Sequence, residues 1–247
     1  MIPRYEQPKI TEIWSDARKV KLWQETEFAV LAARVFLGEL PQETIYAIKE
    51  ACRKNPIDLA WWKERETETG HDLEAFLDER RRFLSPNIRH YLHEKMTSYD
   101  TEEPAFARML QESIEVVERF YDEIQTVLTD MVGRYRYTIM MARTHGQEAE
   151  LQTFGKRCLT WRRDLQFDGV NLKNVKGGLK YSKLSGAIGN YGGIDPAIEK
   201  KTLEILGFEP FYGATQILPR VLSAPIAQAL CQIVMTLDKF ATTVRLG

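Results

Sequence analysis

The pentapeptide Arg143-Thr144-His145-Gly146-Gln147 lies between two long runs of helical pattern, and this arrangement decides the fold. Upstream, from Glu102 to Met141, apolar residues recur at steps of three and four, the period of one face of an α-helix. The run from Leu151 to Leu165 steps in the same way. A helix of about 40 residues would be roughly 60 Å long, and other helices must cover its apolar stripe. The sequence therefore predicts a bundle of long helices, with a histidine and a glycine at the junction of two of them.

The bulk composition excludes several classes of partner. The chain has 247 residues, 44% of them hydrophobic, and a formal net charge of −1, so no basic surface argues for nucleic acid or an anionic membrane. Three widely spaced cysteines form no metal-ligand pattern and are expected to be reduced. We find no signal peptide, and Gln232, Asp238 and Lys239 interrupt the most apolar helix, near residues 226–246. We therefore expect a cytoplasmic protein that does not span a membrane.

Short helical segments fill the first part of the chain, after an irregular start over residues 1–14. Ser15-Asp16 can cap a first helix, and Pro41 starts a second over residues 42–54. Gly70 ends a third segment, and His71-Asp72 opens a fourth. The charged run Glu79–Arg82 on that fourth helix is expected to face mostly solvent.

The second part of the chain predicts longer elements and one glycine-rich loop. Six glycines between residues 176 and 195 indicate loop backbone that can approach a ligand or another chain closely. A short helix is predicted from Pro196 to Gly207, and a last helix from about Ser223. No β-type alternation extends beyond a few residues. We therefore predict an all-α chain, with a small helical domain over residues 1–95 and a long-helix bundle domain over residues 96–247 that is incomplete at its C-terminal end.

The chain offers four histidines as candidates for chemistry. His71 and His145 each lie at a predicted break beside polar residues, where helix ends leave unpaired backbone groups that attract anions. His90 and His93 have the spacing of a metal-binding pair, but no third ligand lies nearby, so we expect no metal. From the residues alone, an ordinary structural role stays open for each histidine.

Several blocks of the sequence resemble the fumarase/aspartase superfamily. The residues that carry this likeness are Arg143-Thr-His-Gly-Gln147, Ala149-Glu150 and Thr153-Phe-Gly155. Three further blocks are similar to the adenylosuccinate lyase family in particular: Met1–Pro8 with Ile13-Trp14-Ser15, Lys183–Gly189 with Ile194-Asp-Pro196, and Thr215-Gln216 with Arg220. The likeness runs in order through essentially all of the chain.

The resemblance implies a carbon–nitrogen lyase with a fumarase/aspartase-type helical bundle. Such enzymes eliminate fumarate from succinylated purine nucleotides, adenylosuccinate or its aminoimidazole analogue, in purine biosynthesis, and they need no cofactor. It also implies a homotetramer whose active sites each draw residues from three chains. Carried over by motif, His145 is the general acid with Thr144 beside it, and His71 assists orientation or proton transfer next to Asp72. The implied substrate-binding residues are Arg4 and Tyr5 for the phosphate, Thr97 and Ser98 for the succinyl carboxylate, and Gln216 and Arg220.

The sequence also departs from the family pattern. The family's signature loop, which bears the serine taken as the catalytic base, is absent, so we expect little or no elimination by this chain alone. Gly70 replaces a basic residue, and Tyr99 replaces a small hydroxyl residue in the Thr-Ser-x-Asp motif. These differences leave two alternatives open. One is another superfamily lyase, argininosuccinate lyase-like or cycloisomerase-like, and the other is a non-catalytic helical scaffold.

Overall fold

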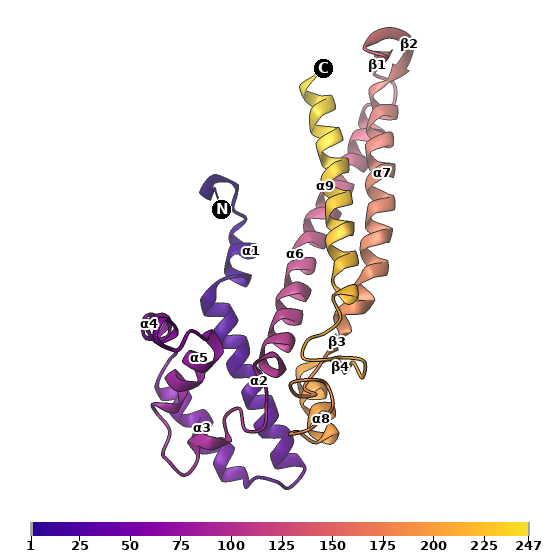
Figure 1. The fold of residues 1–247 in the computed structure, drawn as a ribbon. Helices are drawn as coiled ribbons and strands as arrows, with labels where there is room; N and C mark the ends of the chain where they lie inside the picture. The colour runs from indigo at the N-terminus through magenta and orange to yellow at the C-terminus, as the bar shows by residue number, and fades with distance from the viewer. Residues whose placement is uncertain (1, 247) are drawn as a thin grey trace. The chain divides into compact units, whose positions relative to one another are not determined.

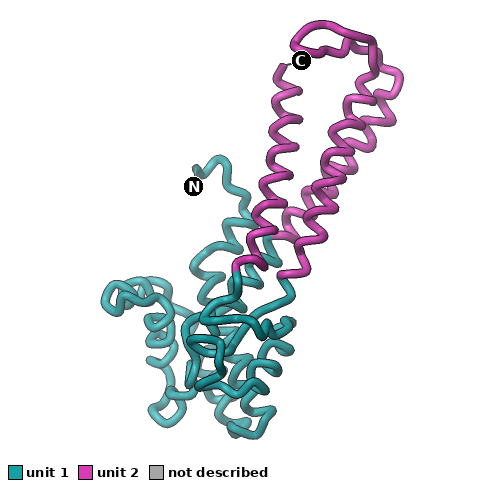
Figure 2. The backbone as a smooth tube through the Cα atoms, turned by 45° about the vertical axis from the view of Figure 1, so that its right-hand side comes forward, with its two compact units in different colours: residues 1–113, 179–219 teal, residues 114–178, 220–247 magenta. Residues whose placement is uncertain are grey.

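The computed structural model describes residues 2–246 and confirms the all-α prediction, with two very small strand pairs added. The chain forms two compact units, which we describe separately (Figure 2). Unit 1 comprises residues 1–113 and 179–219, and unit 2 comprises residues 114–178 and 220–247. Each unit is assembled from two segments that are far apart in the sequence. The predicted boundary near Lys95 instead divides the chain once. That domain boundary stays a prediction.

Unit 1 consists mainly of short helices (Figure 1). Several of them start or end at residues that the sequence signals indicate. The side chain of Ser15 accepts a hydrogen bond from the Arg18 N–H at the start of the first long helix, and Gly70 and Gly207 end helices with φ of 65° and 77°. Its elements are η1 (Pro3–Tyr5), α1 (Pro8–Ile13), α2 (Asp16–Phe36), α3 (Gln42–Lys54), α4 (Leu59–Thr69), α5 (Asp72–Arg81), η2 (Arg89–Tyr91), β3 (Tyr181–Ser182), α8 (Pro196–Leu206), β4 (Glu209–Pro210) and the first part of α6 (Ser98–Arg134).

Two expectations for unit 1 are wrong. The sequence predicts an irregular start over residues 1–14, but residues 8–13 form α1. Pro8 occupies the first turn of this helix, where a missing N–H costs nothing, and the Gln7 side chain caps it. The run Glu79–Arg82 does not face mostly outward, because Glu79 and Arg80 are 0% and 1% exposed. These two side chains form an ion pair, and Arg80 also donates to the Gln24 side chain and to the Asn55 carbonyl.

The main apolar core of unit 1 lies where α2 packs on α8. Leu184 and Ala33 are fully buried there, so the start of the glycine-rich loop is part of the core. The remaining buried members are Val30, Ala107, Ile194, Ile198, Leu203 and Phe208. Through Ala107 this core also includes α6, the helix that begins at Ser98.

Unit 2 contains long helices and a β-hairpin. Its elements are the second part of α6, β1 (Ile139–Thr144), β2 (Gln147–Thr153), α7 (Phe154–Val175), η4 (Arg220–Leu222) and α9 (Ala224–Arg245); η3 (Lys176–Lys180) leads on to unit 1. Helix α6 is 37 residues long but ends at Arg134, so the prediction that it continues to Met141 is wrong. Tyr135, Tyr137, Ile139 and Met141 alternate with other residues, which is a strand period rather than a helical one.

The helices of unit 2 share one core. Trp161 packs at 4.5 Å, between ring centroids, on Phe240, and edge-on against Phe154 at 6.2 Å. Leu128, Cys158 and Leu165 complete the buried cluster. By length and composition alone, one segment of the described chain, Arg220–Arg245, could cross a membrane, although the sequence led us to expect a segment too polar to do so. Helices of soluble proteins also pass this test, so the observation is weak.

Candidate functional site

The structure brings His71 and Ser98, two of the assigned residues, together in unit 1. Gly70 ends α4 in the left-handed conformation and turns the chain, so that His71 becomes the N-cap of α5. The His71 Nδ1 accepts from the Glu74 N–H at 3.4 Å, and Nε2 lies 3.1 Å from the Ser98 Oγ. With Nδ1 accepting, the neutral ring carries its proton on Nε2 and donates to Ser98. His71 remains half-exposed, so a ligand can reach the pair.

Asp72 stands beside this pair in a locally charged environment. One of its oxygens accepts from the Leu73 N–H at 2.8 Å, and the other lies 3.6 Å from the Lys19 Nζ. Lys19 is itself held over the faces of Trp23 and Trp62. Burial raises the pKa of Glu102, and the Asp72 carboxylate raises it further, whereas His71 and Lys19 act in the opposite direction. Glu102 is therefore an additional carboxyl group near the site that the sequence did not single out.

Thr97 and Ser98 are positioned by Asp100, at the start of α6. The Thr97 N–H donates to the Asp100 Oδ2 at 3.0 Å, and the Gly186 N–H donates to Oδ1 at 3.2 Å. Asp100 is 0% exposed. One buried carboxylate thus fixes both the Thr97-Ser98 segment and the glycine-rich loop, since a buried charge with fixed partners allows little movement.

Lys183 completes this buried network. Its ammonium group, also 0% exposed, lies 2.7 Å from the Asp100 Oδ1 and donates to the carbonyls of Gly186 and Gln216 at 3.0 and 2.9 Å. The pair therefore joins three segments that the sequence assigned separately. Asp100 and Lys183 both occur in motifs that resemble the family, but no role was assigned to either residue from the sequence. The available signal was a single lysine, Lys183, among small and apolar residues.

Close backbone contact explains the glycines of the loop. Gly189 has φ of 77°, and a Cβ atom there would lie 2.0 Å from the Ala214 carbonyl oxygen. A Cβ on Gly193 would lie 2.8 Å from the carbonyl oxygen of Lys95. Such distances exclude any side chain without a backbone shift. The loop is thus packed against both the segment before Thr97 and the segment before Gln216.

The remaining assigned residues of unit 1 are exposed. The Arg4 guanidinium lies over the Tyr5 ring at 4.8 Å, within the short helix η1. Within residues 2–246, neither side chain has a hydrogen bond to His71, Ser98 or Gln216. The Gln216 side chain is also exposed, while its carbonyl is bound by Lys183. The structure therefore connects Gln216 to the network through its backbone and leaves Arg4 and Tyr5 outside it.

Thr144 and His145 belong to unit 2, and their local structure differs from the prediction. They lie in a β-hairpin rather than at the junction of two helices. Thr144 pairs with Gln147, which leaves His145 and Gly146 as a two-residue turn with φ of 52° and 76°. Positive φ at both positions is the signature of a type I′ turn, in which glycine is favoured. His145 and Thr144 are exposed, and Arg220, also exposed, begins η4.

His93 has a structural role in unit 1. Its Nδ1 and its backbone N–H both lie 2.9 Å from oxygens of the buried Glu27 carboxylate, which also accepts from the Thr101 hydroxyl at 2.7 Å. Burial alone would raise the pKa of Glu27, but the hydrogen bonds and charge of His93 and the bond from Thr101 outweigh it, so the pKa is lowered. The metal-pair alternative for His90 and His93 therefore loses one of its two ligands to this network.

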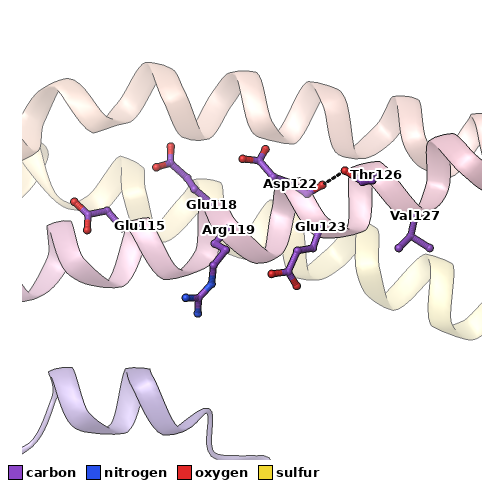
Figure 3. A pocket seen from close by; sticks show the side chains of 7 residues that line it. All are labelled: Glu115, Glu118, Arg119, Asp122, Glu123, Thr126 and Val127. Carbon is purple, nitrogen blue, oxygen red and sulfur yellow. Dashed lines mark hydrogen bonds between the residues drawn. The ribbon is translucent and has the colours of Figure 1, made fainter.

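An acidic hollow lies along α6 in unit 2 (Figure 3). Glu115, Glu118, Asp122 and Glu123 line it with a single arginine, Arg119. None of the assigned site residues lines this hollow. Its charge would repel an anionic substrate, so we do not assign the substrate site to it.

Comparison with known proteins identifies a family of lyases that matches almost the whole chain. A family model described as Lyase matches residues 4–246. Adenylosuccinate lyases from Streptococcus mutans and Aquifex aeolicus are each 32% identical over 99% of this chain and 56% of their own length, and the Bacillus subtilis enzyme is 30% identical over the same shares. The chain thus spans about half the length of these relatives.

Solved structures share the fold at lower sequence identity. A fumarate lyase from Mesorhizobium sp. superposes with a TM-score of 0.89 at 20% identity, over 97% of this chain and 57% of that one. A β-carboxy-cis,cis-muconate cycloisomerase from Acinetobacter calcoaceticus gives a TM-score of 0.89 at 22% identity, with the same coverage. At these identities the likeness concerns the fold alone.

Proposed function

Because the chain belongs to the lyase family, we propose that it serves in β-elimination of fumarate from a succinylated purine nucleotide, the adenylosuccinate lyase reaction of purine biosynthesis. The observation that carries the proposal is the assembly in unit 1, where His71 Nε2 lies 3.1 Å from Ser98 Oγ and the Asp100–Lys183 pair fixes Thr97 and Gln216 around them. The chain is 32% identical to an adenylosuccinate lyase over 99% of its length, and this likeness supports the choice of reaction.

The elimination places defined demands on these side chains. A proton leaves the carbon next to a succinyl carboxylate, the C–N bond breaks, a C=C bond forms, and the leaving nitrogen gains a proton. We assign His145 as the proton donor to that nitrogen, with Thr144 beside it. Thr97 and Ser98 hold the carboxylate on which negative charge develops, through their side-chain hydroxyl groups. His71, fixed by its N-cap bond, orients the substrate next to Asp72.

Nucleotide recognition is assigned to the exposed residues. The Arg4 guanidinium can donate charge-assisted hydrogen bonds to the phosphate, with Tyr5 beneath it, and Gln216 and Arg220 contact the remainder of the substrate. Acid–base steps of this kind use side chains alone, so we assign no cofactor. The protein acts in the cytoplasm in this proposal.

A homotetramer is part of the proposal. Unit 2 exposes apolar side chains on all three of its long helices, among them Val127 of α6, Phe167 of α7 and Met235 of α9, which are 57%, 65% and 72% exposed. Large exposed apolar surfaces mark interfaces. Other copies of the chain would cover these faces and bring His145 of one copy to His71 and Ser98 of another.

A fumarate-release assay tests the proposal. The resemblance implies that the catalytic base lies in a loop outside residues 1–247, so we expect little or no turnover of adenylosuccinate by residues 1–247 alone. Turnover should appear when the C-terminal portion of a relative is supplied in trans. His145→Ala should then lower kcat by about 10²–10⁴-fold, whereas His90→Ala, a change of another exposed histidine, should not.

Four outcomes would contradict the proposal. Rapid turnover by residues 1–247 alone would refute the role given to the absent loop. Elimination from argininosuccinate but not from adenylosuccinate, or AMP binding that survives Arg4→Ala, would favour another lyase of the superfamily. A His145→Ala variant of the intact gene product that retains every cellular function would favour the alternative of a non-catalytic helical scaffold.

A further inference from the structure

A second hollow in unit 1 has a composition suited to an anion. It has a volume of about 690 Å³ and lies among α4, the end of α5 and η2. Four arginines line it, Arg65, Arg81, Arg82 and Arg89, together with His90 and only two carboxylates. None of the residues assigned to the lyase reaction lines this hollow. A volume of this size can hold a small organic ligand.

Both carboxylates of the hollow are already paired. Asp78 binds Arg65 through contacts of 2.7 and 2.8 Å, and Glu94 binds Arg34 at 2.6 Å. Arg81 is also engaged, since it lies 3.0 Å from Glu74 and donates to the Leu92 carbonyl at 3.2 Å. Pairing therefore leaves a surplus of positive charge on the lining.

The surplus charge belongs to Arg82 and Arg89. Within residues 2–246, neither guanidinium has a hydrogen-bond acceptor or a carboxylate partner. The Arg82 guanidinium is nevertheless held in place, because it lies over the Trp61 ring at 4.2 Å and the Phe83 ring at 5.2 Å. Stacking of this kind fixes the plane of an arginine and leaves its N–H donors available.

We propose that this hollow binds a small phosphate-bearing anion through Arg82 and Arg89. A guanidinium presents a planar fork of N–H donors that matches two oxygens of a phosphate. One such fork is enough for a carboxylate, so two on one concave surface favour a phosphate, which has more oxygens to bind. His90 stacks on Tyr91 at 4.0 Å between ring centroids and adds two ring nitrogens to the same wall. The inference is independent of the lyase reaction, whose phosphate contact we assign to Arg4.

Calorimetric titration of the full chain with inorganic phosphate and with glycerol phosphate, at an ionic strength held constant with chloride, tests this inference. We expect saturable binding with one site in this hollow, and a change in Trp61 fluorescence that is absent in Trp61→Phe. Arg82→Gln/Arg89→Gln should weaken binding at this site by about tenfold or more. The matched control Arg53→Gln/Arg163→Gln removes the same charge from exposed positions elsewhere and should leave binding unchanged.

The variants separate this site from the proposed lyase site. Phosphate binding and the Trp61 response should survive Arg4→Ala. The inference is overturned if Arg4→Ala abolishes all phosphate binding, if the control double variant weakens it as much as Arg82→Gln/Arg89→Gln, or if no saturable binding occurs. Binding to phosphatidylcholine vesicles that contain phosphatidic acid, without binding of glycerol phosphate, would also overturn it, because the ligand would then be a membrane surface.

Discussion

Unit 1 and unit 2 differ in how they accommodate charged and apolar side chains. Unit 1 buries charged groups and pairs them within the chain, as with Glu27 and His93, Glu79 and Arg80, and Asp100 and Lys183. Unit 2 has a well-packed core around Trp161 but leaves large apolar side chains of its helices and hairpin exposed. The hydrogen bonds that hold His71, Thr97 and Ser98 are therefore made within one chain, whereas many apolar side chains of the long helices have no cover within it.

This difference indicates which residues of the proposed site are positioned within one chain and which depend on assembly. Thr97, Ser98 and His71 are held by bonds that a single chain provides, so their arrangement does not depend on assembly. His145 lies on an exposed hairpin turn with no comparable set of fixed partners. Assembly would have to position it, which is consistent with an active site shared between copies.

The largest expected effect follows from breaking the buried pair of unit 1. Lys183→Met leaves the Asp100 carboxylate and the Gly186 and Gln216 carbonyls buried without their donor. We expect a loss of about 3–5 kcal/mol of unfolding free energy, measured by urea denaturation. Lys180→Met is the matched control, because Lys180 pairs with Glu209 at the surface and such pairs contribute about 0–1 kcal/mol. Similar losses in both variants would contradict the assigned role of the pair.

A smaller effect on stability is expected in unit 2, where the start of α7 packs against the residues that follow α6. Gly155 lies in the Thr-Phe-Gly block, and a Cβ there would lie 2.8 Å from backbone atoms of Tyr135 and Arg136. Gly155→Ala should therefore destabilise the protein by about 1–3 kcal/mol. Gly133→Ala should instead stabilise it by about 0.5–1 kcal/mol, because nothing lies within 4 Å of a Cβ there. Thermal unfolding of both variants checks the sign of each effect.

The smallest effect concerns the pH dependence of unit 1. Burial and Asp72 raise the pKa of Glu102 above the ordinary value of 4.5, so the folded state holds this proton more tightly than the unfolded state. The unfolding free energy should fall as the pH rises from 4.5 through the raised pKa. Glu102→Gln should reduce that fall and increase stability at pH 7 relative to the unmodified chain. Glu64→Gln, on exposed α4, is the control, and an equal change in both would contradict the assignment.

Local signals predicted most of the helices and part of the site. Ser15, Gly70 and Gly207 act through their own backbone and nearest neighbours, so their effects can be read from the sequence. The family motifs implied separate roles for His71 and Ser98, and the hydrogen bond between them is seen only in the structure.

The features that were missed depend on partners distant in the sequence. Arg80 is buried because Gln24 and the Asn55 carbonyl accept from it, and neither partner is evident from a charged helical run. The bonds of Lys183 to Asp100 and Gln216 likewise join three separate segments. The hairpin was missed because its alternation is short and follows directly on a strong helical period.

Sedimentation equilibrium of the chain tests the central contrast most directly. The account predicts a mass near four times the 28.6 kDa of one chain. It also predicts dissociation by Met235→Glu, on the exposed face of α9, with the helical circular dichroism of unit 1 retained, while Ile205→Glu on α8 of unit 1 leaves the mass unchanged. A stable monomer at micromolar concentration, with its apolar helical faces still in water, would contradict the account.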